Sequence, residues 1–239
     1  MNTPDHGMDA LNRMSDQMVT CQKLALVGRL CSSITHEINN HLTGVSGYAQ
    51  FLLSQDKAKT VTKEVDKIYT SATKCQKLIS ELKRFARFSE TREFDNINLI
   101  VKSSLDLVRH LFAKKSLQLI ENYAPDIPAS EVDTPALQQM FLNIIQNSFE
   151  ALQEKGSSLS IATFNENGHV VALLEDDGPG LSEDARARLF TPFFTTKAHL
   201  QCVGLGLPAA KLVAEAHGGT LEVGNSPKGG TCVKICLPC

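Results

Sequence analysis

Residues 142–180 read LNIIQNSFEALQEKGSSLSIATFNENGHVVALLEDDGPG, and the character of the chain changes twice within this stretch. Its first part continues a helical pattern that begins near Thr134, a residue suited to the N-cap, with Pro135 in the first turn. SLSIATF and HVVALLEDD then predict two strands joined by the turn signal NENG, and a Gly-rich loop follows. A helix followed by paired strands indicates an α+β fold.

The rest of the C-terminal half keeps alternating between helical and strand-like periods. INLIVKSSLDLVRHLF (97–112) has a helical period, and a strand-like stretch with Leu117, Leu119 and Glu121 follows it. A further helix is predicted over about 205–217, and TLEV and TCVKICL predict two last strands. We therefore expect an α/β sandwich whose mostly antiparallel sheet carries its helices on one face.

The N-terminal half has only helical periodicity. Residues 9–54 predict one long helix, and a second helix runs from the break at SQDKAKT to about residue 90. The apolar stripe of the second helix averages about 3.5 residues per repeat, the period of a coiled-coil seam. Two such helices form a hairpin that cannot bury both stripes alone, so we expect a four-helix bundle made by dimerisation; the alternative is a hairpin packed only on its own C-terminal half. The stripe residues are Leu24, Val27, Cys31, Ile34, Ile38, Leu42 and Val45, then Val61, Val65, Ile68, Ala72, Cys75, Ile79, Leu82 and Ala86.

The composition argues against several classes of protein. The chain has 239 residues, a net charge of -2 and no Trp, which disfavours a basic or aromatic nucleic-acid-binding surface. No apolar run reaches the roughly 18 residues of a membrane span, and the polar N-terminus lacks the pattern of a signal peptide. We therefore expect a soluble, cytoplasmic protein with reduced thiols. Cys232, Cys236 and Cys239 have a spacing that some metal sites use, but the alternation in VKICLP favours a strand.

A candidate nucleophile lies in SITHEINNHLTG (33–44). The stripe residues two positions on either side of His36 lie about 200° round the helix from it, so the imidazole should face solvent. Glu37 follows it, and Asn40 lies one turn later on the same face. An imidazole with one free nitrogen, and a proton acceptor at the other, is a usable nucleophile. The alternative is an ordinary surface histidine beside a surface glutamate.

Two further clusters suit a ligand. Asn143 and Asn147 share a helix face although Asn disfavours helix interiors, which indicates either oxygen donors for a ligand or metal, or simple solvent exposure. In LLEDDGPGLS an apolar strand leads to Asp176, whose carboxylate can accept a hydrogen bond from an amine. The glycines after it let the backbone approach a flat ring, although an ordinary turn would have the same composition.

A last cluster, CVGLGLPAAK (202–211), begins a helix. Gly204 and Gly206 precede Pro208, which is tolerated in a first helical turn, and free N–H groups at such a start attract phosphate. The stretch LFTPFFTTKAHLQ (189–201) has no clear period and could form a mobile lid over a nucleotide.

In their order and spacing these stretches resemble the motifs of sensor histidine kinases, from about residue 20 to 238. THEINN resembles the phosphoacceptor box, LNIIQNSFEA the asparagine box, DDGPG the first glycine box and LFTPFFTTK the phenylalanine box. GLGL, followed by HGGTLEV and GGT, is similar to the second glycine box and the closing strands. The resemblance implies an N-terminal helical extension (1–20), a dimerisation and histidine phosphoacceptor domain (21–92) and a catalytic ATP-binding domain of the Bergerat type (93–239).

The resemblance also implies an activity and partners. His36 would be phosphorylated from ATP and would pass the phosphate to an aspartate of a response regulator receiver domain, in two-component signal transduction. Glu37 would take or polarise the proton on the far ring nitrogen, and Asn40 matches the position implicated in dephosphorylating the regulator. We expect a homodimer with an upstream sensor partner acting in trans, since no sensor domain is evident, and neither nucleic-acid binding nor a membrane span.

ATP and Mg²⁺ are the implied cofactors. Asn147 would hold Mg²⁺ between the ATP phosphates with support from Asn143, and Asp176 would bind the adenine amine. The other implied nucleotide-binding residues are Gly178, Gly180 and Thr231 near the base, Gly204, Gly206 and Leu207 near the phosphates, and Phe193, Phe194 and Lys197 in the lid.

Three positions depart from the family pattern. His41 stands where relatives often have proline, so a straighter helix is expected. Cys202 replaces a glycine, which could stiffen the lid or place a thiol near the nucleotide. Glu150 stands where many relatives have a basic residue, so we expect no phosphate contact from it. Two rival functions stay open: a Bergerat-type ATPase or serine-directed kinase, and a non-enzymatic dimeric adaptor.

Overall fold

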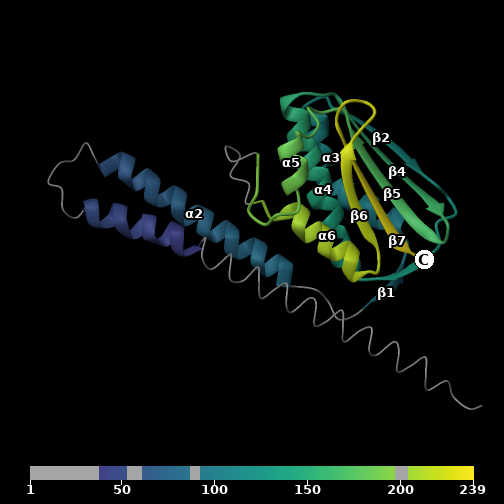
Figure 1. The fold of residues 1–239 in the computed structure, drawn as a ribbon, viewed down its shortest axis with the longest axis horizontal. Helices are drawn as coiled ribbons and strands as arrows, with labels where there is room; N and C mark the ends of the chain where they lie inside the picture. Colours follow the sequence, from purple (N-terminus) through teal and green to yellow (C-terminus); the bar gives the residue numbers. More distant parts are fainter. Residues whose placement is uncertain (1–37, 53–60, 87–91, 197–203) are drawn as a thin grey trace, which may run out of the picture. The chain divides into compact units, whose positions relative to one another are not determined.

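The computed structural model describes residues 38–52, 61–86, 92–196 and 204–239. The chain divides into two compact units, Met1–Ala86 and Arg87–Cys239, and each is described by itself. Figure 1 traces the described helices and strands along the chain. The predicted site residues His36, Glu37 and Lys197, and also Cys202, lie outside the described residues.

The N-terminal unit contains a helical hairpin. Residues 38–52 form one described helix and α2 (Val61–Ala86) forms the other, and the two lie side by side (Figure 1). The Cys75 thiol donates to the carbonyl oxygen of Ile38 at 3.7 Å, so the two helices touch. The helix that contains His41 is continuous from residue 38 to residue 52.

α2 carries its apolar residues on two neighbouring faces. Cys75 is 6% exposed and Ile68, one heptad earlier, is half-buried, so this row faces the other helix of the hairpin. Val65, Ala72 and Ile79 form a second row at heptad spacing, and all three are exposed, Val65 by 46% and Ile79 by 42%. Among the described stripe residues of α2, one copy of the hairpin therefore covers the row of Ile68 and Cys75 and leaves the other row exposed.

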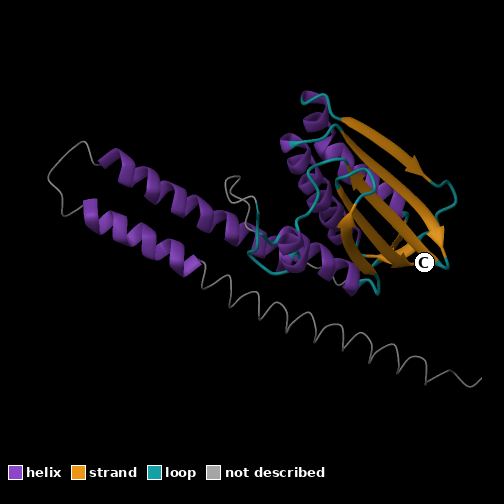
Figure 2. Cartoon of the chain, turned by 45° about the horizontal axis from the view of Figure 1, so that its top comes forward, coloured by secondary structure: helices purple, strands orange, loops and turns teal. Residues whose placement is uncertain are grey.

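The C-terminal unit is a mixed sheet with helices on one face, which confirms the expected fold class (Figure 2). The main sheet has five strands in the order β2-β4-β5-β7-β6, and all neighbours are antiparallel except β2 and β4. β1 and β3 form a separate antiparallel pair. The elements are β1 (Glu93–Asp95), α3 (Ile97–Lys114), β2 (Gln118–Tyr123), β3 (Ser130–Val132), α4 (Thr134–Glu154), β4 (Ser158–Glu166), β5 (His169–Asp176), α5 (Glu183–Arg188), α6 (Gly206–Ala216), β6 (Thr220–Asn225) and β7 (Thr231–Pro238).

The predicted hairpin between β4 and β5 forms with a two-residue turn. Asn167 and Gly168 have positive φ values of 52° and 78°, and Glu166 pairs with His169 across the turn. Asn and Gly favour such a turn because both tolerate the left-handed backbone region. This turn sets the register that brings the end of β5 back beside α4.

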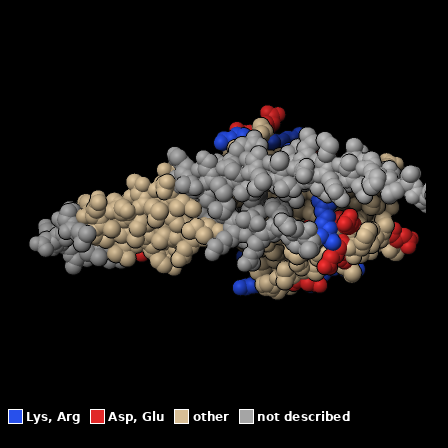
Figure 3. All heavy atoms as spheres, turned by 90° about the horizontal axis from the view of Figure 1, so that it is seen from below, with Lys and Arg blue, Asp and Glu red and all other residues tan. Residues whose placement is uncertain are grey.

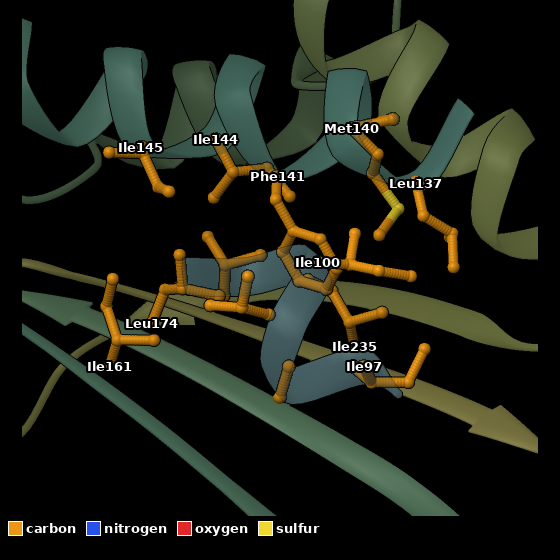
Figure 4. Close-up of a cluster of buried hydrophobic side chains, with 14 of the residues drawn as sticks. Ile97, Ile100, Leu137, Met140, Phe141, Ile144, Ile145, Ile161, Leu174 and Ile235 are labelled. Carbon is orange, nitrogen blue, oxygen red and sulfur yellow. The ribbon is translucent and has the colours of Figure 1, made fainter. Parts of the chain in front are cut away.

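The hydrophobic core lies between the sheet and the helices (Figure 4). Phe141, Ile144 and Ile145 of α4 point toward the sheet, and each is at most 1% exposed. Ile161 and Leu174 meet them from β4 and β5, because alternate residues of a strand face the same side. Burying a side chain of this size stabilises the fold by roughly 1.5–3 kcal/mol, so this layer fixes where α4 sits on the sheet.

The N-cap of α4 is Asp133 and not Thr134, so that prediction is wrong. Asp133 Oδ1 accepts from the Ala136 amide at 3.0 Å, which satisfies a free N–H group of the first turn. The Thr134 hydroxyl instead donates to Asp95 Oδ2 at 2.8 Å, a contact to β1 that the local sequence does not reveal.

α4 and α6 are also joined at one end. His217 Nε2 accepts from the Asp133 amide at 3.0 Å, so its Nδ1 carries the proton and donates to the Val213 carbonyl at 2.7 Å. Arg92 Nη2 donates to the Ala216 carbonyl at 2.6 Å, at the C-terminal end of α6. The N-terminal end of α4 and the C-terminal end of α6 are thereby held together.

The strand interpretation of the C-terminal cysteines is confirmed. Val233, Ile235 and Leu237 of β7 are buried in the core, whereas Cys232 and Cys236 are half-buried on the other face. Burial, with the nearby carboxylates of Glu175 and Asp176, raises the pKa of the Cys232 thiol, which disfavours the thiolate that metals bind.

The described surface carries charges of both signs. On the face drawn in Figure 3, basic and acidic side chains lie interspersed over the described residues and form no broad patch of one sign, in keeping with a net charge of -2. Within the described ranges, no helix has both the length and the apolar character needed to cross a lipid bilayer.

Candidate functional site

Asp176, at the end of β5, has one carboxylate oxygen held by the backbone and the other available. Oδ1 accepts from the Gly178 amide at 3.0 Å and from the Thr231 amide at 2.9 Å, and the residue is 2% exposed. Oδ2 makes no hydrogen bond within the described part of the chain, yet it does not rank among the fully buried unpaired atoms there. A carboxylate fixed in this way presents Oδ2 to a donor entering from outside.

Glycines allow the backbone to close around Asp176. A Cβ added to Gly178 would lie 2.9 Å from Asp176 Oδ1. A Cβ added to Gly230 would collide with the Asp176 carbonyl oxygen and would lie 2.5 Å from both Asp176 Oδ1 and the Gly178 nitrogen. Gly180 has a φ of 73°, and a Cβ there would lie 2.9 Å from the Gly229 carbonyl. The end of β5, the loop at 178–180 and the residues just before β7 therefore pack closely around the Asp176 carboxylate.

Gly230 belongs to the GGT motif but was not predicted as a site residue. It lies opposite the end of β5 because β7 pairs with β5, and that long-range pairing cannot be read from sequence spacing.

The neighbouring Asp177 has a structural role. Its carboxylate accepts from the Ser157 amide at 2.7 Å, the Ser157 hydroxyl at 2.7 Å and the Ser158 amide at 2.8 Å. Burial alone would raise the pKa of this carboxyl, but the hydrogen bonds outweigh burial and lower the pKa to about 2. Asp177 thus holds the turn between α4 and β4, while Asp176 faces the site.

A polar row on α4 faces the start of α6. Asn143 and Asn147 are half-buried, and a Cβ added to Gly206 would lie 3.9 Å from Asn143 Cβ and 3.9 Å from Asn147 Nδ2. The structure thus brings together three predicted site residues from two helices. Among the described residues, no group of three or more His, Cys, Asp or Glu side chains could hold a metal ion, so a cation here would need oxygen ligands from elsewhere.

The first turn of α6 keeps its amides available. The N-cap residue Leu205 makes no side-chain capping hydrogen bond, and Pro208 has no amide proton. The amides of Gly206 and Leu207 are therefore free to bind an anion at the positive end of the helix dipole.

Phe193, Phe194 and Gly204 hold together the two ends of the predicted lid. The Phe193 amide donates to the Gly204 carbonyl at 3.1 Å. Gly204 has a φ of 73°, and a Cβ there would lie 2.5 Å from the Phe194 carbonyl oxygen, so only glycine fits. The Arg188 guanidinium lies 4.2 Å from the centre of the Phe194 ring, which fixes that aromatic side chain.

In the N-terminal unit, the structure describes one of the predicted catalytic residues. Asn40 is exposed on the helix 38–52, as the position of a residue outside the apolar stripe predicts. Glu150, in the other unit, is half-buried on α4.

Residues 26–91 match the family model of the His Kinase A (phospho-acceptor) domain, and residues 132–239 match that of the histidine kinase-, DNA gyrase B- and HSP90-like ATPases. This chain belongs to the sensor histidine kinases. His36 lies within the matched phospho-acceptor region, and Asn143, Asp176 and Gly206 lie within the matched ATPase region. The expected family is therefore confirmed for this histidine kinase.

The histidine kinase also resembles individual proteins. It is 32% identical over 236 residues to the C4-dicarboxylate transport sensor protein DctB of Pseudomonas aeruginosa, covering 95% of this chain and 38% of that protein. It is 30% identical over 249 residues to the sensory histidine kinase/phosphatase NtrB of Azospirillum brasilense, covering 95% of this chain and 60% of that protein. The chain thus spans less than two thirds of the length of either relative.

Among solved structures, histidine kinase ThkA in complex with the response regulator protein TrrA shares the fold. The TM-score is 0.66 at 22% identity, over 96% of this chain and 66% of that one. The mycobacterial sensor histidine kinase MprB matches with a TM-score of 0.54 at 25% identity, over 62% of this chain and 97% of that one.

Proposed function

We propose that this histidine kinase transfers the γ-phosphoryl group of ATP to its own His36 and then to an aspartate of a response regulator receiver domain. The observation that carries the proposal is the presence, in one chain, of a phospho-acceptor domain containing His36 and an ATPase domain. In the first step a nitrogen of His36 forms a bond to the γ-phosphorus while the bond to the bridging oxygen breaks and ADP leaves. Glu37 accepts or polarises the proton on the other ring nitrogen.

The nucleotide base binds at Asp176. The free Oδ2 of this carboxylate accepts from the adenine amine, and Gly178, Gly180 and Thr231 line the base. Guanine has a carbonyl oxygen at the equivalent ring position, and two acceptors would then face each other. Because a site built to accept a hydrogen bond rejects a group that cannot donate, ATP is the preferred nucleotide over GTP.

The phosphates bind between α4 and α6, next to the lid residues Phe193 and Phe194, and Lys197 is a further proposed nucleotide-binding residue. Asn143 and the free amides of Gly206 and Leu207 provide donors to phosphate oxygens. Asn147 provides an amide oxygen to Mg²⁺, which fits a cation that arrives with the nucleotide, because Mg²⁺ commonly combines few protein oxygens with substrate phosphates. When bound, Mg²⁺ neutralises charge on the phosphates during transfer.

The chain acts as a homodimer in the cytoplasm, where ATP is available. The exposed row of Val65, Ala72 and Ile79 supports dimerisation, since a second hairpin would bury it. The structure of ThkA with TrrA supports a receiver-domain partner, and the name of NtrB, which includes phosphatase, supports dephosphorylation through Asn40. A separate sensor protein or region provides the stimulus.

The test is labelling with γ-³²P-ATP and Mg²⁺ in the full chain. We expect acid-labile, alkali-stable label on the wild type and none on His36→Ala, because the P–N bond of phosphohistidine has that stability pattern whereas the ester bond of phosphoserine is stable in acid. His41→Ala is the matched control, since it removes a second imidazole of the same helix, and it should keep the label. Full labelling of His36→Ala would overturn the proposal, and failure of the wild type to bind ATP would favour the adaptor alternative.

A further inference from the structure

Gln139 lies in line with the two asparagines of α4. Gln139, Asn143 and Asn147 follow one another at steps of four residues, so they share one face of the helix, about 6 Å apart along its axis. All three side chains are half-buried. Gln139 Nε2 donates to Asn143 Oδ1 at 2.8 Å. The sequence motifs did not single out Gln139.

This hydrogen bond determines which end of the Asn143 amide is available. An asparagine amide has an acceptor oxygen and a nitrogen with two N–H donors. Since Oδ1 accepts from Gln139, the nitrogen Nδ2 is the end left to bind a ligand, and it has no partner within the described ranges. Nδ2 is also not sealed inside the protein, because Ser130 Oγ is the one fully buried, unpaired side-chain polar atom of the described part.

The surroundings of Asn143 suit an anion. Gly206 lies opposite, and a Cβ there would be in ordinary contact with Asn143 Cβ at 3.9 Å. The uncapped start of α6 directs the amides of Gly206 and Leu207 into the same region. An Asn143 that presents N–H donors adds to this set, whereas its oxygen would repel the same phosphate oxygens.

We propose that Gln139 is a positioning residue of the nucleotide site, which holds the Asn143 amide with its donors toward the phosphates of ATP. This assignment rests on the proposed function. It gives the two asparagines different ligands: Asn143 binds a phosphate group and Asn147 binds the metal ion. Gln139 acts through Asn143 and needs no contact with the nucleotide. Its effect is therefore confined to ligands that carry phosphates.

The first test replaces Gln139 with Met, which has a similar length and no donor, in the full chain. The dissociation constant for ATP with Mg²⁺ should rise about five- to tenfold, the effect of losing one ordinary hydrogen bond, while that for adenosine stays within about twofold. Both are measured by displacement of a fluorescent nucleotide, together with the melting temperature. Gln138→Met is the matched control, because Gln138 Nε2 donates to Ser103 Oγ on α3 at 3.1 Å, and it should change neither affinity.

The second test separates positioning from a general loss of structure. In an Asn143→Ala background, Gln139→Met should change ATP affinity by less than about twofold, because the group it orients is gone. The inference is overturned if Gln139→Met weakens ATP and adenosine equally, or weakens ATP equally with and without Asn143. If the wild type binds no ATP, the proposed function fails instead, and the inference falls with it.

Discussion

At the scale of single residues, the site depends on a carboxylate whose backbone and Oδ1 are closely packed by neighbouring residues. Asp176 receives two backbone amides on one oxygen, and Gly230 packs directly against its backbone and side chain. The adjacent Asp177 is bound by three hydrogen bonds from Ser157 and Ser158. Two identical side chains in sequence thus differ in role because the backbone turns between them.

Gly230→Ala tests how closely the site is packed. The added methyl group would meet the Asp176 backbone and Oδ1, and these atoms belong to a strand end that cannot swing aside. We expect ATP affinity to fall at least about tenfold and the free energy of unfolding to fall by about 1–3 kcal/mol, the usual range for overpacking. Calorimetric titration with ATP and thermal unfolding measure the two effects.

Gly224→Ala is the control for this substitution. Gly224 lies on β6, and a Cβ there has nothing within 4 Å. It should leave ATP binding and stability unchanged. Wild-type ATP affinity in Gly230→Ala would show that the base does not bind beside Asp176.

At the scale of the elements, the connections between helices and strands place the site. The turn between α4 and β4 is closed by Asp177, which comes from the end of the next strand. The far ends of α4 and α6 are joined through His217 and Asp133. α4 and α6 therefore keep their polar faces together at Asn143 and Gly206.

Asp177→Asn should reduce stability in a way that depends on pH. The folded pKa of about 2 lies below the ordinary value of about 3.9, so the carboxylate stabilises the fold above pH 4, and this contribution is lost as the pH falls toward 2. The wild type should be more stable than the variant by about 1–2 kcal/mol at pH 7, and the difference should shrink between about pH 4 and pH 2.

Urea unfolding at a series of pH values measures this difference. Asp184→Asn serves as the control, because its carboxylate is exposed and lies 3.8 Å from Arg188 in a surface ion pair, which contributes little. A stability difference for Asp177→Asn that stayed constant from pH 7 to pH 2 would contradict the role of the carboxylate.

At the scale of the whole molecule, the exposed apolar row on α2 indicates contact with a second copy of the chain. Val65, Ala72 and Ile79 repeat at heptad spacing and remain exposed in one copy of the hairpin. Such rows are buried when two hairpins form a four-helix bundle.

Val65→Glu should therefore shift the protein from dimer toward monomer, because each copy would bring an unpaired charge into the apolar interface. The dimer dissociation constant should rise by about tenfold or more, measured by sedimentation at a series of concentrations. Thr70→Glu adds the same group at an exposed position on the opposite side of α2 and should leave the dimer intact. A wild type that sediments as a monomer at all concentrations would contradict the dimer.

Local patterns in the sequence were sufficient for most of the elements, but they did not predict β1, β3 and α5. The helical hairpin, the strands β4, β5, β6 and β7, the Asn-Gly turn and the order of the family motifs all follow from short-range periodicity and composition, because helix and strand periods and turn preferences act over a few residues. The family expectation is confirmed for the same reason, since its motifs are contiguous stretches. The roles of individual site residues remain proposals.

Only the tertiary structure decided which side chains meet. Asp133 caps α4 in place of Thr134 because β1 takes the threonine hydroxyl. Gly230 lies against Asp176 because β7 pairs with β5, and Asn143 faces Gly206 because α4 and α6 pack on the same face of one sheet. These contacts join residues that are tens of positions apart, and their geometry depends on how the whole core packs, which no local pattern contains.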